Sequence, residues 1–127
     1  MKEREAGQAL VEMAIVLPLL LLLLFGMVEV GRIYSTSLSM NSIARDAARN
    51  GAVGASDADI RQLIQDRGTL LVPERVTVTV IPQTSDRHRG QALTVKINYL
   101  LPINVPVLMS MLPNPFPLQA VCTMRIE

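Results

Sequence analysis

Apolar residues are distributed unevenly along the chain, with one long run near its start and alternating segments nearer its end. Between Glu12 and Glu29 lie 16 residues without a charge, MAIVLPLLLLLLFGMV. As a helix rising about 1.5 Å per residue, this run would cover about 24 Å, and its apolar flanks extend it toward a hydrocarbon core of about 30 Å. A leucine run of this kind is apolar on every side, unlike a soluble helix with one apolar face. The pattern therefore predicts a membrane-spanning helix.

A helical pattern continues beyond this run. Small and apolar residues recur at steps of three and four, which places them on one stripe of a helix. We expect a single helix from Gln8 to Asn50, ended by Gly51 and Gly54, with Pro18 as a candidate kink because proline removes a backbone donor. The stripe consists of Ile33, Ser37, Met40, Ile43 or Ala44, Ala47 and Gly51.

The rest of the chain has the pattern of a small folded head. Ser56 precedes two acidic residues and an apolar face, which predicts the N-cap of a short helix that stops at Gly68. Residues 75–81 and 92–99 alternate between apolar and polar side chains, as half-buried strands do, and the polar loop between them suits a hairpin. Residues 118–127 alternate in the same way and predict a last strand.

These elements predict an α+β fold. A long N-terminal helix, partly transmembrane, would be followed by a small head with a short helix and about three antiparallel strands. We expect four parts: a charged leader-like segment at 1–7, the transmembrane part of the helix at 8–30, its soluble continuation at 31–54 and the head at 55–127.

A proline-rich apolar stretch interrupts the head at residues 102–117. Within it, Ile103 to Leu112 is predicted as a short apolar helix or as a patch that meets the membrane or a partner, with packing into the core as the favoured interpretation. Cys122 falls on the apolar side of the last strand, so we expect it to behave as a small buried hydrophobe.

Composition and charge narrow the range of functions. The formal net charge is +1 and the basic residues are scattered, which argues against nucleic acid as a partner. Cys122 is the single cysteine, so an intrachain disulfide is excluded, and zinc-type ligand spacing is missing. His88 is the single histidine and lies in a polar loop. We expect no catalytic residues, no metal, no cofactor and no small-molecule substrate, and therefore not an enzyme.

One carboxylate, Glu12, lies at the edge of the apolar run, where burial alone would favour an apolar residue. An acid near the start of a helix gains about 0.3–1 kcal/mol from the helix dipole, which is one interpretation. The position of Gly7 favours another, because Gly7 precedes Glu12 by a short spacer, Gln8-Ala-Leu-Val, and the apolar run follows at once. Gly7 also has a simpler interpretation, as a flexible residue before a helix.

This arrangement is similar to a type IV prepilin signal, in which the cleavage site precedes the hydrophobic run. The wider stretch GQALVEMAIVLPLLLLLLFGMVEVGRIY closely resembles the N-terminal segment of TadE-like proteins, which are minor pilin-like or pseudopilin components of the tight-adherence (Flp) pilus system. The resemblance is carried by Gly7, Gln8, Glu12, Pro18 with the leucines that follow it, the exit Glu29-Gly31-Arg32, and a closing strand that ends in Met124-Arg125-Ile126-Glu127.

The resemblance implies a processing step and an assembly step. A membrane aspartyl prepilin peptidase would cut after Gly7 and leave Gln8 as the new amino terminus. Glu12 would then meet the free amine of a neighbouring subunit. A charge near hydrocarbon costs about 2.5–3.5 kcal/mol on insertion scales, so such pairing would favour the correct register. Met13 follows Glu12 where the main Flp pilins have tyrosine, which favours a minor component.

The resemblance also implies a location and a set of partners. It places the protein as a single-pass protein of the bacterial inner (cytoplasmic) membrane, with its head outside the cytoplasm, either staying there or entering an extracellular pilus. The positive-inside rule does not decide the orientation, because basic residues flank the run on both sides. The implied partners are the prepilin peptidase, other pilin-like subunits, the pilus assembly platform and membrane lipid. Glu29 and Arg32, three residues apart, are expected to form a solvated ion pair at the far interface.

Two other classes of protein fit the same pattern. An uncleaved single-pass membrane protein, whose head binds a partner in a secretion or pilus complex, would need neither processing nor assembly. A small secreted binding domain, released by signal cleavage between residues 31 and 37, would lose the apolar helix altogether. The length of the mature chain separates these alternatives.

Overall fold

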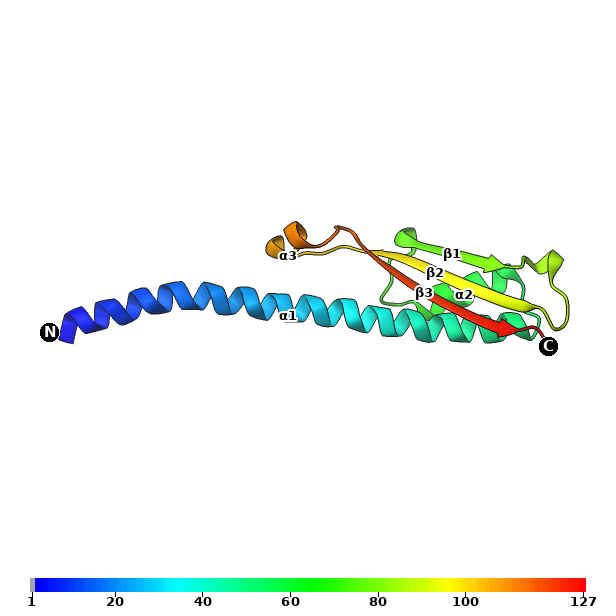
Figure 1. Ribbon diagram of the computed structural model, residues 1–127, viewed down its shortest axis with the longest axis horizontal. Helices are drawn as coiled ribbons and strands as arrows, with labels where there is room; N and C mark the ends of the chain where they lie inside the picture. Colours follow the sequence, from blue (N-terminus) through cyan, green and yellow to red (C-terminus); the bar gives the residue numbers. More distant parts are fainter. Residues whose placement is uncertain (1) are drawn as a thin grey trace.

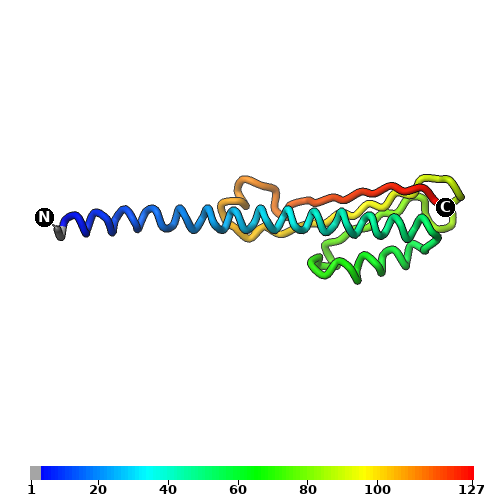
Figure 2. Tube along the Cα trace, turned by 90° about the horizontal axis from the view of Figure 1, so that it is seen from below, coloured from blue at the N-terminus to red at the C-terminus, as the bar shows by residue number. Residues whose placement is uncertain are grey.

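The computed structural model describes residues 2–127, with side chains from residue 4 onward (Figure 1). One long helix, α1 (Lys2–Ala52), runs the full length of the molecule. The remaining chain packs beside its C-terminal half, while its N-terminal half stands alone in both Figure 1 and Figure 2. The helix begins earlier than the expected Gln8, so the charged segment before the apolar run is helical as well.

The head is a small sheet with two helices on one face and a third helix at its end. Its elements are α2 (Asp57–Arg67), a 3₁₀ turn (Pro73–Arg75), β1 (Val76–Ile81), a second 3₁₀ turn (Thr84–Asp86), β2 (Ala92–Leu101), α3 (Pro106–Met111) and β3 (Phe116–Arg125). The strands are antiparallel in the order β1-β2-β3. Helix α1 packs on β2 and β3, and α2 packs beside α1. The predicted α+β class, with a long helix and a three-stranded head, is confirmed.

The alternation along β2 explains why the sheet has one buried face. Leu93, Val95 and Ile97 are fully buried under the helices, while the residues between them lie on the other, partly exposed face. From α1 the core receives mostly small side chains, including Ala44 and Ala47, which let the helix backbone approach the sheet. The stripe predicted from helical periodicity is therefore the face that α1 buries.

Gly51 permits the closest approach between helices and sheet. A Cβ atom at Gly51 would lie 2.4 Å from Leu93 Cδ2 and 2.9 Å from Ile60 Cδ1. We expected Gly51 to end the helix, but α1 continues through it to Ala52. The chain turns at Gly54, whose φ is 108°, a conformation that glycine adopts at low energetic cost. The glycine at position 51 is therefore explained by close packing against the sheet and not by the end of the helix.

The segment between β2 and β3 runs past the end of the sheet. The last paired residues are Leu101 and Phe116, and the connection beyond them extends along α1 toward its N-terminus (Figure 1). Ile103 is 2% exposed, but no residue of α3 is buried. The expectation that residues 103–112 pack into the core is therefore wrong for most of the segment. The sheet ends before this segment, and across a hollow from its first residues lie Phe25, Val28 and Glu29 of α1.

Candidate processing and assembly site on the N-terminal helix

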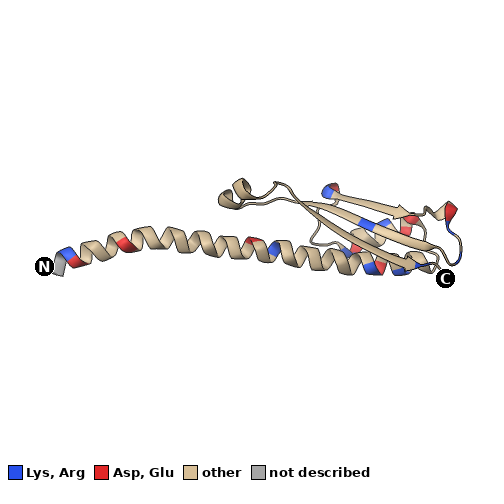
Figure 3. Ribbon diagram, viewed as in Figure 1, with Lys and Arg blue, Asp and Glu red and all other residues tan. Residues whose placement is uncertain are grey.

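The N-terminal half of α1 is an apolar rod that nothing in the chain covers. We call residues 4–28 of α1 the stalk. Every large apolar side chain from Leu10 to Val28 is at least 42% exposed, and Figure 3 shows one long uncharged stretch here. An exposed apolar surface of this extent is not stable in water. The helix is long and apolar enough to cross a membrane, which supplies the missing cover.

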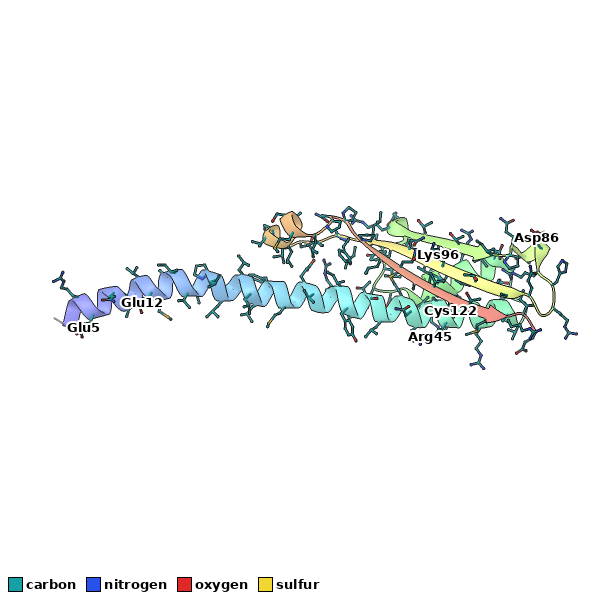
Figure 4. All side chains as sticks on the ribbon, in the orientation of Figure 1. Glu5, Glu12, Arg45, Asp86, Lys96 and Cys122 are labelled. Atoms are coloured by element: carbon teal, nitrogen blue, oxygen red, sulfur yellow. The ribbon has the colours of Figure 1, made fainter. Side chains whose placement is uncertain are left out.

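Glu12 projects from the stalk far from the head (Figure 4). Its side chain is exposed. Among the side chains of residues 4–127, the three ion pairs join Glu29 to Arg32, Asp46 to Arg67 and Asp57 to Arg87, so none includes Glu12. Any cation that pairs with this carboxylate must therefore come from outside the described part of the chain.

Gly7 has no structural reason in its own chain to be glycine. It lies inside α1, and a Cβ atom there would meet nothing within 4 Å. Glycine inside a helix costs about 1 kcal/mol relative to alanine, so it weakens this first part of α1. Gly7 and Gln8 are both exposed. Recognition by another molecule would explain why a glycine that weakens the helix is present at this open position.

Pro18 lies inside α1, and the helix continues through it. Proline lacks the amide that would bond the carbonyl of Ala14, so one backbone acceptor of the stalk is left free. Figure 1 shows the blue part of α1 curving gently, without a break.

Glu29 and Arg32 form an ion pair that also holds the β2–β3 connection. Arg32 Nη2 lies 2.5 Å from Glu29 Oε1 and donates a second hydrogen bond to the carbonyl of Pro102. Glu29 Oε1 also accepts a hydrogen bond from the backbone amide of Asn104, at 3.2 Å. We call this set of four residues the latch. It fastens the connection to α1 at the end of the stalk.

The latch differs from the solvated pair that we expected. Glu29 is 5% exposed, so its carboxylate is buried against the head. The i,i+3 spacing indicated that the two charges could meet, but Pro102 and Asn104 carry no sequence signal that links them to α1. Their part in the latch depends on the path of the β2–β3 connection. Only the fold shows it.

Side chains that often carry catalysis lie apart from one another. His88 is exposed in the loop after β1, and Cys122 is half-buried on β3, where it packs against the core. Within residues 2–127, no three histidine, cysteine, aspartate or glutamate side chains gather in a way that could hold a metal. The residues that stand out in this molecule are therefore those of the stalk and the latch.

An uncovered apolar stalk that continues into a head-packed helix defines the class: a membrane-anchored protein with one spanning helix and a small α+β head. The sequence model of the family described as TadE-like protein matches residues 7–49. Over this segment the chain resembles the TadE-like family, which confirms the resemblance seen in its N-terminal residues.

The bounds of the family match include the candidate processing and assembly residues and exclude the head. It begins at Gly7, includes Glu12, Pro18, Glu29 and Arg32, and ends at Arg49, before the head. No curated protein and no solved structure matches the chain.

Proposed function

We propose that the protein is a non-catalytic, pilin-like subunit, a minor pilin or pseudopilin, in the assembly of a tight-adherence pilus. A prepilin peptidase would cut it after Gly7. The observation that carries the proposal is the family match that starts at Gly7 and covers the stalk from that residue onward, with its unpaired Glu12. The open position of Gly7 and the exposed apolar surface of the stalk support it.

The proposed chemistry is an ion pair between subunits. Cleavage creates an ammonium group on Gln8, and this group is a cation placed at the same end of the stalk as Glu12. In hydrocarbon or near it, a lone carboxylate costs about 2.5–3.5 kcal/mol on insertion scales. When the new amine of one subunit meets Glu12 of the next, both charges are compensated. Subunits in the wrong register lose this compensation, so the pair selects one register.

The proposed arrangement assigns a task to each part of the chain. Before assembly the stalk spans the inner membrane, with the head outside the cytoplasm. During assembly the exposed apolar surface of the stalk exchanges lipid for the helices of other pilin-like subunits, because both environments remove it from water. The head remains outside as the part that meets the assembly platform or the surroundings.

The first test is the intact mass and N-terminal sequence of the protein isolated from its native membrane. A chain that starts at Gln8 would support processing after Gly7. A chain that starts at Met1 would favour the uncleaved anchor with a partner-binding head. A start beyond residue 30 would mean that the apolar run is a secretory signal.

A pair of glycine variants then tests recognition at the cleavage site. Gly7→Val should abolish processing, because a peptidase that requires glycine cannot accept the branched side chain. Gly26→Val is the matched control, since a Cβ at either position meets nothing within 4 Å and neither change disturbs the chain itself. Normal maturation of Gly7→Val would contradict the prepilin interpretation. If both variants, Gly7→Val and Gly26→Val, were absent from the membrane, the result would indicate failed insertion.

A further inference from the structure

Helix α3 presents apolar side chains that the head does not use. Val107, Met109 and Met111 are 41%, 45% and 75% exposed. We call these three residues the α3 patch. None of the six residues of α3 is buried, although four of them are apolar besides the initial proline. In water such a patch would be unfavourable, so a cover is expected.

The place of the α3 patch suggests what covers it. In Figures 1 and 2, α3 and its flanking loop are the part of the head that reaches furthest along α1 toward its N-terminus. A hollow between the two is lined by Phe25 and Val28 of the stalk, by Val105 of the loop and by Pro106, the first residue of α3. The surface of the loop is thus continuous with the lipid-facing surface at the exit of the span.

The latch holds α3 at this level. Glu29 and Arg32 bind the backbone at Asn104 and Pro102, just before α3. At the neck of the connection, the side chain of Asn114 accepts a hydrogen bond from the amide of Ile103, at 3.1 Å. The first end of the loop is therefore fastened to α1, and its second end is fastened to the first. Its distance from the end of the stalk is set by the fold.

The charge pattern permits contact with a bilayer. From Ile97 to Met124 the chain carries no charged side chain, and Figure 3 shows the α3 region without charge. The uncharged run of the span ends at Val28, and Glu29 follows it. The hollow that joins stalk and loop lies at this same level. An uncharged apolar loop at the headgroup level suits the interface, where apolar side chains leave water while the backbone stays hydrated.

We propose that the α3 patch inserts into the headgroup region of the leaflet on the head's side and forms a second, lateral contact with lipid beside the span. Two contacts, the stalk and the patch, fix the tilt and the rotation of the head relative to the bilayer. The inference rests on the membrane span alone. It is independent of cleavage after Gly7 and of any role for Glu12.

The observations favour lipid over a second copy of the chain as the cover. The α3 patch consists of three residues and lies at the level where the stalk ends, so insertion of the span brings it to the lipid surface without any further partner. Depth-dependent fluorescence quenching in the full chain can test this. A single cysteine is placed at Met111 or, as a second position in the same patch, at Val107, in a Cys122→Ala background. An environment-sensitive fluorophore is attached and the protein is inserted in phosphatidylcholine vesicles.

The quencher is phosphatidylcholine that carries a doxyl group near the top of its acyl chain. Two control positions frame the result: Met27→Cys at the end of the stalk, 64% exposed, and Val53→Cys at the far end of the head, also 64% exposed. We expect several-fold quenching at positions 111 and 107, comparable with that at 27, and none at 53. The quenching should not change when more lipid is added per protein.

Two outcomes would overturn the proposal. If position 27 is quenched while 107 and 111 are not, the patch lies outside the lipid. If 107 and 111 are protected from aqueous iodide without doxyl quenching, and the protection falls as lipid dilutes the protein, a second copy covers the patch instead. Because neither outcome depends on the amino terminus, failure here would be distinct from failure of the proposed processing.

Discussion

The backbone amide of Asn104 donates a hydrogen bond to the carboxylate of Glu29, 75 positions earlier in the chain, at 3.2 Å. Arg32 completes the contact, because one of its nitrogens bonds both Glu29 and the carbonyl of Pro102. These bonds join the end of the apolar span to the connection that carries α3. The head is thereby attached to α1 at the membrane end as well as through its core.

Removal of the latch carboxylate should loosen this attachment. Glu29→Ala leaves the amide of Asn104 and the guanidinium of Arg32 without their shared acceptor. Breaking a buried pair costs about 3–5 kcal/mol, but the Arg32 side chain is 35% exposed and can regain water. We therefore expect a loss of about 1–3 kcal/mol in the free energy of unfolding, together with faster hydrogen exchange at Asn104. Urea denaturation and exchange of the full chain in detergent micelles would measure both.

The matched control is the exposed pair between Asp46 and Arg67, whose N–O distance is also 2.5 Å. Its side chains are 37% and 60% exposed, so solvent screens the attraction. Asp46→Ala should cost less than about 1 kcal/mol and leave exchange at Asn104 unchanged. Equal losses for both variants would contradict the idea that burial gives the latch its strength.

Much of the fold follows from periodicity alone. The apolar run and its continuing stripe predicted one long helix, and the strict alternation in β2 predicted which side chains, such as Leu93 and Val95, are buried. Ser56 was predicted as an N-cap, and it forms a capping box with Asp59. These features are local, because each depends on the spacing of residues within one element.

What the sequence did not reveal depends on residues far apart. Glu29 was expected to be solvated because its own helix shows only the neighbour Arg32. Its burial depends on the return of the chain at Asn104. Likewise, the apolar segment around α3 looked like core because its composition says nothing about the sheet ending at Leu101. Gly7 and Glu12 were singled out only by their spacing before the apolar run. Their roles remain predictions.

A side chain at position 51 should destabilise the fold. An added methyl group would meet Leu93 and Ile60, which are both fully buried and cannot move freely. Gly51→Ala should therefore lower the free energy of unfolding by about 1–3 kcal/mol, despite the better helix propensity of alanine. Gly31→Ala is the control, since that position is open and the change should add about 0.5–1 kcal/mol. Stabilisation by both changes would show that α1 does not pack so closely.

The capping box of α2 predicts a dependence of stability on pH. The hydrogen bond from the Ser56 side chain, followed by the one from its backbone amide, lowers the pKa of Asp59 below its ordinary value of 3.8. A lowered pKa means that the folded state favours the carboxylate. Its contribution is therefore present above pH 3.8 and is lost as the pH falls through the pKa of the folded state.

Two variants separate the contribution of the Asp59 charge to stability from that of the Ser56 cap. The difference in unfolding free energy between wild type and Asp59→Asn should be present at neutral pH and vanish in acid. Ser56→Ala should cost about 0.5–2 kcal/mol and bring the pKa of Asp59 back toward its ordinary value. Urea denaturation across this pH range, with NMR titration of Asp59, would measure both. A pH-independent difference for Asp59→Asn would refute a contribution from its charge.

Glu12 provides the sharpest test of assembly. Glu12→Gln removes the charge and keeps the size of the side chain, so insertion of the stalk should be unchanged or slightly easier. If the carboxylate pairs with the amine of a neighbouring subunit, incorporation into pili should fall at least tenfold, because a pair worth more than about 1.4 kcal/mol changes an equilibrium by that factor.

Glu5→Gln is the matched control: Glu5 is also exposed on the same end of α1, but cleavage after Gly7 would remove it. Immunoblots of membrane and sheared-pilus fractions would measure the two steps separately. Equal incorporation of Glu12→Gln and wild type would exclude the ion pair, and an effect of Glu5→Gln as large as that of Glu12→Gln would show that the loss is not specific to Glu12.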